Sequence, residues 1–161
     1  MIKEYYSVVT AGIFTWLLTL LVGGLLFETF VLYPNIFYDV PTSLGQSMEF
    51  LKAGSPGKFF RPLGGFILFI GLITIASSIR HRTLLRFMGA SFLIIVAGEF
   101  IFSVYFFWPR NTIMFTEGLK VHSAEKLIAI ANEFQQFHWL RLVNAIVASS
   151  IAAVGLVRCF Y

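Results

Sequence analysis

The chain has 161 residues, of which 58% are hydrophobic and only 12% are charged, and its mean hydropathy is +0.82. Because a soluble domain carries about 25% charged residues, this composition excludes an ordinary water-soluble protein. The net charge of +4 is small and is spread near the ends of apolar segments, so it indicates membrane topology and not a nucleic-acid partner. At about 20 residues per crossing, the length predicts four spans in a single domain, residues 1–161.

The first apolar segment runs between Glu4 and Glu28 without a charged residue. It is longer than the core of a signal peptide and no A-x-A cleavage site follows it, so we expect an uncleaved span. The span is predicted to continue to Tyr33, because Pro34-Asn35 is the first strong stop signal. Glu28 should then lie inside the membrane, about 9 Å from that stop.

A long loop follows over residues 35–60. Within it Leu44, Met48 and Leu51 recur at helical spacing, which predicts a short amphipathic helix at the membrane surface. The second span is expected from Pro62 to Ser78, with the proline in its first turn.

The third span is expected from Phe87 to Trp108, where Pro109-Arg110-Asn111 should end it. Glu99 is the only charged residue inside this span. It should lie near the middle of the membrane, about 15 Å from the proline.

A second long loop is expected over residues 112–137. Ser123 is a candidate N-cap for an amphipathic helix, whose pattern is Leu127, Ile128, Ala131, Phe134 and Gln135. No Pro or Gly occurs over 119–154, so this helix is expected to continue into the fourth span, which has its uncharged run at 142–157. The predicted fold is therefore an all-α bundle of four transmembrane helices, with amphipathic helices in both long loops.

The short connection between the second and third spans contains Arg80, Arg82 and Arg86 and is the most basic loop. Because cytoplasmic loops carry an excess of Lys and Arg, we expect this loop and both termini to be cytoplasmic. The expected location is the inner membrane of a bacterium, with both long loops on the outer side.

Several polar side chains are expected in or beside the outer half of the membrane: Glu28, Lys58, Arg61, Glu99, Arg110, Asn111, His138, Arg141 and Asn144. A charge at the centre of a span costs roughly 2.5–3.5 kcal/mol on insertion scales, so these groups should be paired or face a wet cavity. One interpretation is a structural ion pair of Glu28 or Glu99 with Arg141. The other is a single outward-opening pocket that holds Glu28, Glu99, His138, Arg141 and Asn144.

In such a pocket the side chains have distinct chemical uses. His138 is a candidate general acid or base, since an unperturbed imidazole titrates near pH ~6.5. Arg141 would hold an enolate, phenolate or carboxylate oxygen, and Glu99 would carry a proton. Candidate substrate-binding residues at this side are Glu28, Arg61, Asn111 and Asn144.

A metal ion is not expected. Glu28, Glu99 and His138 would be its ligands if one were bound, but the chain has no Glu-x-x-His pair of the di-iron type. Haem is not expected either, because His81, His122 and His138 do not form an obvious pair of axial ligands. We therefore expect a protein without a cofactor.

Three short motifs give the chain a family resemblance: Glu28 with Pro34 at the end of the first span, the Pro109-Arg110-Asn111 stop, and Trp139 with Arg141 at the start of the fourth. In these the chain resembles the anthrone-oxygenase-like family of small four-helix membrane proteins. Members from polyketide pathways oxidise an anthrone to an anthraquinone with molecular oxygen. The resemblance implies roles for Asn111, Trp139 and Arg141, while the long loops differ from the family in length and composition.

Two kinds of function stay open. The first is a cofactor-independent oxygenase or other oxidoreductase that acts on a lipophilic small molecule. The alternative is a non-enzymatic protein: an accessory or assembly subunit, a homo-oligomer, or a transporter component, with structural ion pairs in the membrane. A solvent-reachable pocket with Arg141 unpaired would favour the enzyme, and a closed Glu99–Arg141 pair in a dry bundle would favour the structural role.

Overall fold

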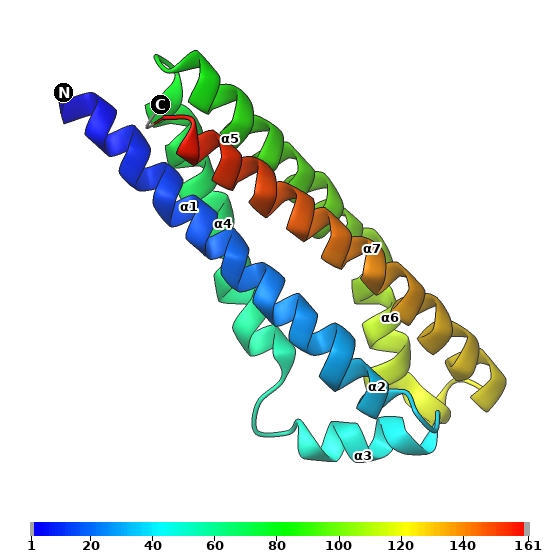
Figure 1. Cartoon of the computed structure of the whole chain (residues 1–161). Helices are drawn as coiled ribbons and strands as arrows, with labels where there is room; N and C mark the ends of the chain where they lie inside the picture. The colour runs from blue at the N-terminus through cyan, green and yellow to red at the C-terminus, as the bar shows by residue number, and fades with distance from the viewer. Residues whose placement is uncertain (1, 160–161) are drawn as a thin grey trace.

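Four long apolar helices form a bundle in the computed structural model, which describes residues 2–159 (Figure 1). The apolar helical segments are Tyr5–Ile36, Pro56–Ser78, Arg82–Lys120 and Ala124–Val157, and each is long enough to cross a bilayer. No strand occurs over residues 2–159. The chain is therefore an integral membrane protein with an all-α fold, as its composition predicts.

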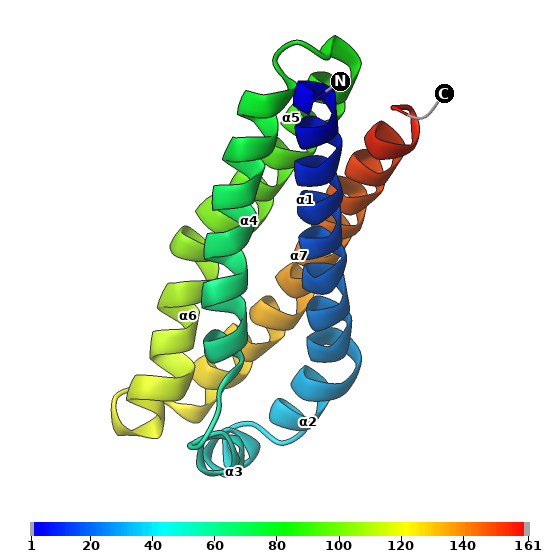
Figure 2. The same ribbon diagram turned by 90° about the vertical axis from the view of Figure 1, so that its left-hand side faces the viewer.

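The helices pack in a ring in which α1 (Ile2–Phe27) contacts both α4 (Pro56–Ser78) and α7 (Ala124–Val157). The ring is completed by α5 (Arg82–Ile95), which packs on α7 and on α4. Both ends of the chain and the α4–α5 turn lie at one end of the bundle, and α2, α3 and α6 lie at the other (Figures 1 and 2).

The first helix does not end at Pro34. It passes from α1 into a π-helical turn, Glu28–Leu32, and then into α2, Tyr33–Ile36. In the π-helical turn the Tyr33 N–H donates to the Glu28 carbonyl, five residues back. The widened turn accommodates the proline, which stands in the first turn of α2, so the predicted stop comes too early.

The second helix begins at Pro56 and not at Pro62, which lies inside α4. Pro56 occupies the first turn, preceded by Ser55 in an extended conformation, and so takes the position expected for Pro62. The predicted amphipathic helix of the preceding loop is present as α3, Thr42–Phe50. It buries Leu44 against the bundle and leaves Met48 partly exposed.

The third helix continues well past Trp108, so the prediction that Pro109-Arg110-Asn111 ends it was wrong. After α5 come two π-helical segments, Val96–Ile101 and Ser103–Phe107, and then α6, Trp108–Thr112. A further π-helical turn, Ile113–Glu117, and a 3-10 turn, Gly118–Lys120, complete the helix. The Trp108 N–H donates to the Ser103 carbonyl, five residues back, so Pro109 again follows a widened turn.

The fourth helix, α7, is one unbroken element of 34 residues, which confirms the expected continuity. Ser123 caps it, because its Oγ accepts a hydrogen bond from the Lys126 N–H at 3.3 Å. The amphipathic pattern predicted for the second long loop is thus the first part of α7. Its buried members, Leu127, Ala131 and Phe134, face the bundle.

The interior contains two apolar clusters. One includes Phe14, Leu25 and Leu142, nearer the chain termini, and the other includes Tyr33, Phe107 and Phe134 at the opposite end. Glu28 comes three residues after Leu25, and Arg141 directly precedes Leu142. A layer of polar side chains that includes Glu28 and Arg141 therefore lies where the two apolar clusters meet.

Candidate functional site

A buried ion pair connects the third helix to the fourth. Glu99, which is 5% exposed, lies in the π-helical segment Val96–Ile101. Its Oε2 accepts from Arg141 Nε at 3.0 Å and lies 2.9 Å from Nη2. The guanidinium also lies over the ring of Phe107, 4.6 Å from the centroid. The second carboxylate oxygen, Glu99 Oε1, is buried and has no hydrogen-bond partner.

A second polar pair lies beside the first, formed by Glu28 and His138. Glu28 Oε2 lies 4.0 Å from His138 Nε2, which is too long for a direct hydrogen bond. The same Nε2 lies 3.5 Å from the Leu25 carbonyl oxygen, and Tyr33 lies near enough to the Glu28 carboxylate to interact with it electrostatically. His138 is 1% exposed, and its other nitrogen, Nδ1, has no partner.

Aromatic rings enclose the imidazole. The ring centroids of Tyr33 and His138 are 4.5 Å apart in an edge-to-face arrangement, and the Phe107 ring lies 6.3 Å away. The Phe134 ring is parallel to the imidazole within 4° at 6.5 Å. This shell leaves the imidazole in an apolar surrounding except for Glu28 and the Leu25 carbonyl.

Tyr33 and Phe107 belong to this cluster but are not evident from the sequence. Glu28 and Tyr33 are five residues apart, a spacing that does not place two side chains on the same face of an α-helix. The π-helical turn Glu28–Leu32 changes that register, because its hydrogen bonds span five residues. Both carboxylates lie in π-helical segments, a local structure found frequently at functional sites.

The remaining predicted residues are less closely associated with the cluster. Asn144 is half-buried and packs on Gly98, where an added Cβ would lie 2.6 Å from its Nδ2. Trp139 is 49% exposed and packs edge to face on Phe30 at the outer surface of the bundle. Arg61 is exposed and Asn111 is half-buried, and neither forms a hydrogen bond or ion pair with any residue of the described range. The roles proposed for these residues stay predictions.

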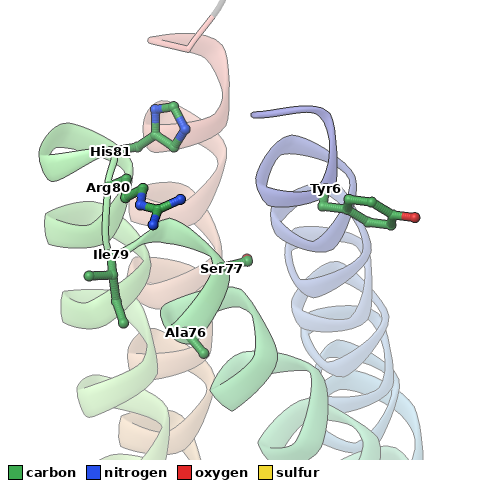
Figure 3. Close-up of a pocket in the computed structure, with 6 residues that line it drawn as sticks. All are labelled: Tyr6, Ala76, Ser77, Ile79, Arg80 and His81. Carbon is green, nitrogen blue, oxygen red and sulfur yellow. The ribbon is translucent and has the colours of Figure 1, made fainter. Parts of the chain in front are cut away.

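The ion pair is closed, not solvent-facing. The Glu99 and Arg141 side chains are 6% and 13% exposed. Two hollows lie elsewhere: one, shallow and about 340 Å³ in volume, is lined by Pro62, Gly65, Phe66 and Phe69 of α4. Another, of about 350 Å³, lies at the α4–α5 turn (Figure 3). The structure thus shows a largely buried ion pair, and the outward-opening pocket at Arg141 stays a prediction.

Two further ion pairs lie near the α6 end of the bundle. Arg110 binds Glu133 of α7 through Nη2 at 2.7 Å and Nε at 3.2 Å, and lies over the Phe106 ring. His122 Nε2 lies 2.5 Å from Glu117 Oε2, with Lys126 Nζ 3.0 Å from its Nδ1. Lys58 donates to the Ala53 carbonyl instead of joining either pair.

The donor set does not resemble a metal site. Over residues 2–159 no three His, Cys, Asp or Glu side chains are grouped so that they would hold a metal ion. Glu28 and His138 approach one another, whereas Glu99 is held by Arg141. The expectation of a cofactor-free protein stays a prediction.

Comparison of the chain with protein-family models, with curated proteins and with solved structures found no match.

Proposed function

We propose that this membrane protein binds a lipophilic small molecule with an acidic hydroxyl, enol or activated C–H group, and that His138 accepts its proton. The observation that carries the proposal is the pair of buried, unpartnered atoms His138 Nδ1 and Glu99 Oε1. A buried polar atom without a partner costs about 1–3 kcal/mol, and its presence needs an explanation. A polar group of a ligand would supply the missing hydrogen bonds.

The tautomer of the imidazole supports this role. With Nε2–H directed at the Leu25 carbonyl, Nδ1 carries the free lone pair and is the acceptor. Arg141 uses Nε and Nη2 for Glu99, so Nη1 remains for an oxyanion that forms when the substrate loses its proton. The apolar shell of Tyr33, Phe107 and Phe134 suits an aromatic substrate.

The resemblance to anthrone oxygenases extends the proposal to an oxidation. After His138 removes the C–H proton, the anion would react with molecular oxygen, and an anthrone would give an anthraquinone and one water. Molecular oxygen is the oxidant, and no metal is needed to balance the reaction. We propose this activity as the most specific form of the function.

The test is oxygen uptake by the detergent-purified protein with anthrone as the probe. His138→Ala should lose the uptake, while the matched variant His122→Ala, whose side chain pairs with Glu117 outside the cluster, should keep it. Uptake that is equal in wild type and His138→Ala would remove His138 from the mechanism. Metal analysis and an optical spectrum belong to the same experiment, since a stoichiometric metal lost in His138→Ala would overturn the cofactor-free mechanism.

A non-enzymatic role is the second candidate, favoured by the closed Glu99–Arg141 pair. An accessory or assembly subunit would use that pair to hold the third and fourth helices in register. In this case the wild type would neither bind anthrone nor consume oxygen. Native mass spectrometry would show it as a homo-oligomer or in complex with another membrane protein.

We also infer that the end of the bundle with the α4–α5 turn faces the cytoplasm, in a bacterial inner membrane. Arg80, Arg82 and Arg86 gather there, and the two chain ends lie at the same end (Figure 1).

A further inference from the structure

A hollow of about 350 Å³ lies at the end of the bundle away from the Glu99–Arg141 pair. It is lined by Tyr6 of α1, by Ala76 and Ser77 at the end of α4, and by Ile79, Arg80 and His81 of the α4–α5 turn. Figure 3 shows the Arg80 guanidinium on the side of the turn that faces α1, with the His81 ring above it. Neither the proposed reaction nor the buried cluster uses any of these residues.

The arginine at this hollow has no partner among the described residues. Arg80 is exposed and forms no ion pair or hydrogen bond with a described residue. Arg82 and Arg86 follow within the next two turns, and the sequence has no acidic residue between Glu49 and Glu99. An anion in the hollow would therefore be attracted by these arginines, and no carboxylate of residues 50–98 would compete with it for them.

The lining combines polar and apolar groups in a definite order. Figure 3 shows His81 and Arg80 nearest this end of the bundle, with the apolar side chains of Ile79 and Ala76 below them. Ile79 is 64% exposed and Tyr6 is 61% exposed, which is typical of side chains at a membrane–water interface. A cationic rim above an apolar wall matches a phosphate headgroup and the start of its acyl chain.

The Ser77 hydroxyl at the base of the hollow already has hydrogen-bond partners. Ser77 Oγ lies 3.0 Å from Thr10 Oγ1 and 3.0 Å from the Thr74 carbonyl oxygen. These contacts join α1 to α4 and keep the two walls of the hollow in place. The lining side chains whose donors have no partner among the described residues are thus Tyr6, Arg80 and His81, and the two of the α4–α5 turn suit a phosphate oxygen.

We propose that this hollow is a phosphate-binding site that takes the headgroup of an anionic phospholipid. Its volume is near the lower end of the range for ligand sites, which suits a headgroup and not a whole lipid. Basic pockets between transmembrane helices on the cytoplasmic side are known to hold acidic headgroups. The bound lipid would fix the α4–α5 turn against α1 at the membrane surface.

The test is native mass spectrometry of the full chain in neutral detergent, titrated with phosphatidylglycerol, phosphatidylcholine or inorganic phosphate. The key variant is Arg80→Gln, and the matched control is Arg86→Gln, which removes the same charge from the same basic segment but does not line the hollow. Because Arg80→Gln removes a charge-assisted hydrogen bond to the phosphate as well as a charge, it should weaken phosphatidylglycerol binding about tenfold or more. Arg86→Gln removes only a nearby charge, so its loss should be clearly smaller, about fivefold at most.

The outcomes distinguish the possible sources of phosphate. A preference for phosphatidylglycerol over phosphatidylcholine that Arg80→Gln abolishes and His81→Gln weakens supports the lipid headgroup. Binding of inorganic phosphate that depends on Arg80, without a preference between the lipids, supports the phosphate site but replaces the lipid by a soluble ligand. If Arg80→Gln and Arg86→Gln weaken phosphatidylglycerol binding equally, the effect is general electrostatic attraction and the proposed site is wrong. The proposal is also wrong if no binding depends on Arg80.

Discussion

Glu99 and Arg141 form a buried pair in which one carboxylate oxygen accepts from Arg141 Nε at 3.0 Å and lies 2.9 Å from Nη2. The two residues are 42 positions apart and lie on neighbouring helices. The other carboxylate oxygen is unpartnered, and Asn144 packs on the adjacent Gly98. The pair therefore fixes the third helix against the fourth at the level where the candidate site lies.

Removing the carboxylate should cost more than removing the guanidinium. Glu99→Leu leaves a buried arginine that cannot lose its charge, and we expect a loss of about 3–5 kcal/mol in the free energy of unfolding. Arg141→Met leaves a carboxyl group that can bind a proton, so its cost should be smaller. The double variant should lose less than the sum of the two. Unfolding in mixed micelles measures all three, and additive losses would show that the pair is not coupled.

The ion pair between Arg110 and Glu133 should contribute little. The two side chains are 25% and 51% exposed, and exposed pairs are worth about 0.2–1 kcal/mol. Glu133→Gln should lower the free energy of unfolding by less than about 1 kcal/mol. Arg110 keeps its bond to the Phe106 carbonyl in that variant. A loss as large as that of Glu99→Leu would contradict the assignment of the polar core to Glu99 and Arg141.

Close packing of α7 on α5 makes Gly155 sensitive to substitution. A Cβ at this position would lie 2.4 Å from the Cβ of Phe87, an atom that cannot move without its backbone. Gly155→Ala should therefore destabilise the protein by about 1–3 kcal/mol. Gly23→Ala is the matched control, because a Cβ there meets nothing within 4 Å and the change raises helix propensity. Thermal unfolding of the two variants compares them, and a stable Gly155→Ala would refute the contact.

Cys159, the sole cysteine, provides a natural probe of topology. Partial burial raises the pKa of its thiol, and the Sγ–H donates to the Gly155 carbonyl at 3.4 Å. A raised pKa means less thiolate at neutral pH, so maleimide labelling should be slow there and faster as the pH rises. If the C-terminus is cytoplasmic, a membrane-impermeant maleimide should label Cys159 only after the cells are permeabilised.

The control for this experiment places the thiol at the other end of the bundle. Ser55 is exposed in the loop before α4, so a Cys159→Ser, Ser55→Cys variant should be labelled in intact cells. Labelling of Cys159 in intact cells, with Ser55→Cys protected, would reverse the predicted orientation.

Much of the fold follows from the order of apolar and polar residues. Four uncharged runs predict four spans, because each charge buried in lipid is costly. The helix α3 and the unbroken α7 also follow from helical periodicity and from the lack of Pro and Gly over 119–154. The helix ends predicted at Pro34 and Pro109 and the helix start predicted at Pro62 are wrong, because the helices accommodate all three prolines. At Pro34 and Pro109 this is achieved by π-helical turns, which have no distinct sequence signal.

For the candidate site, too, one part follows from the sequence and another part does not. Composition and spacing by themselves determine that Glu28, Glu99, His138 and Arg141 stand within or beside apolar runs long enough to cross a membrane. Only the tertiary structure decides that Glu99 pairs with Arg141, that the Tyr33 ring packs on His138, and that the ion pair is largely buried. The physical reason is that such contacts depend on the rotation of each helix about its axis. A single π-helical turn changes that rotation without changing the hydropathy of the chain.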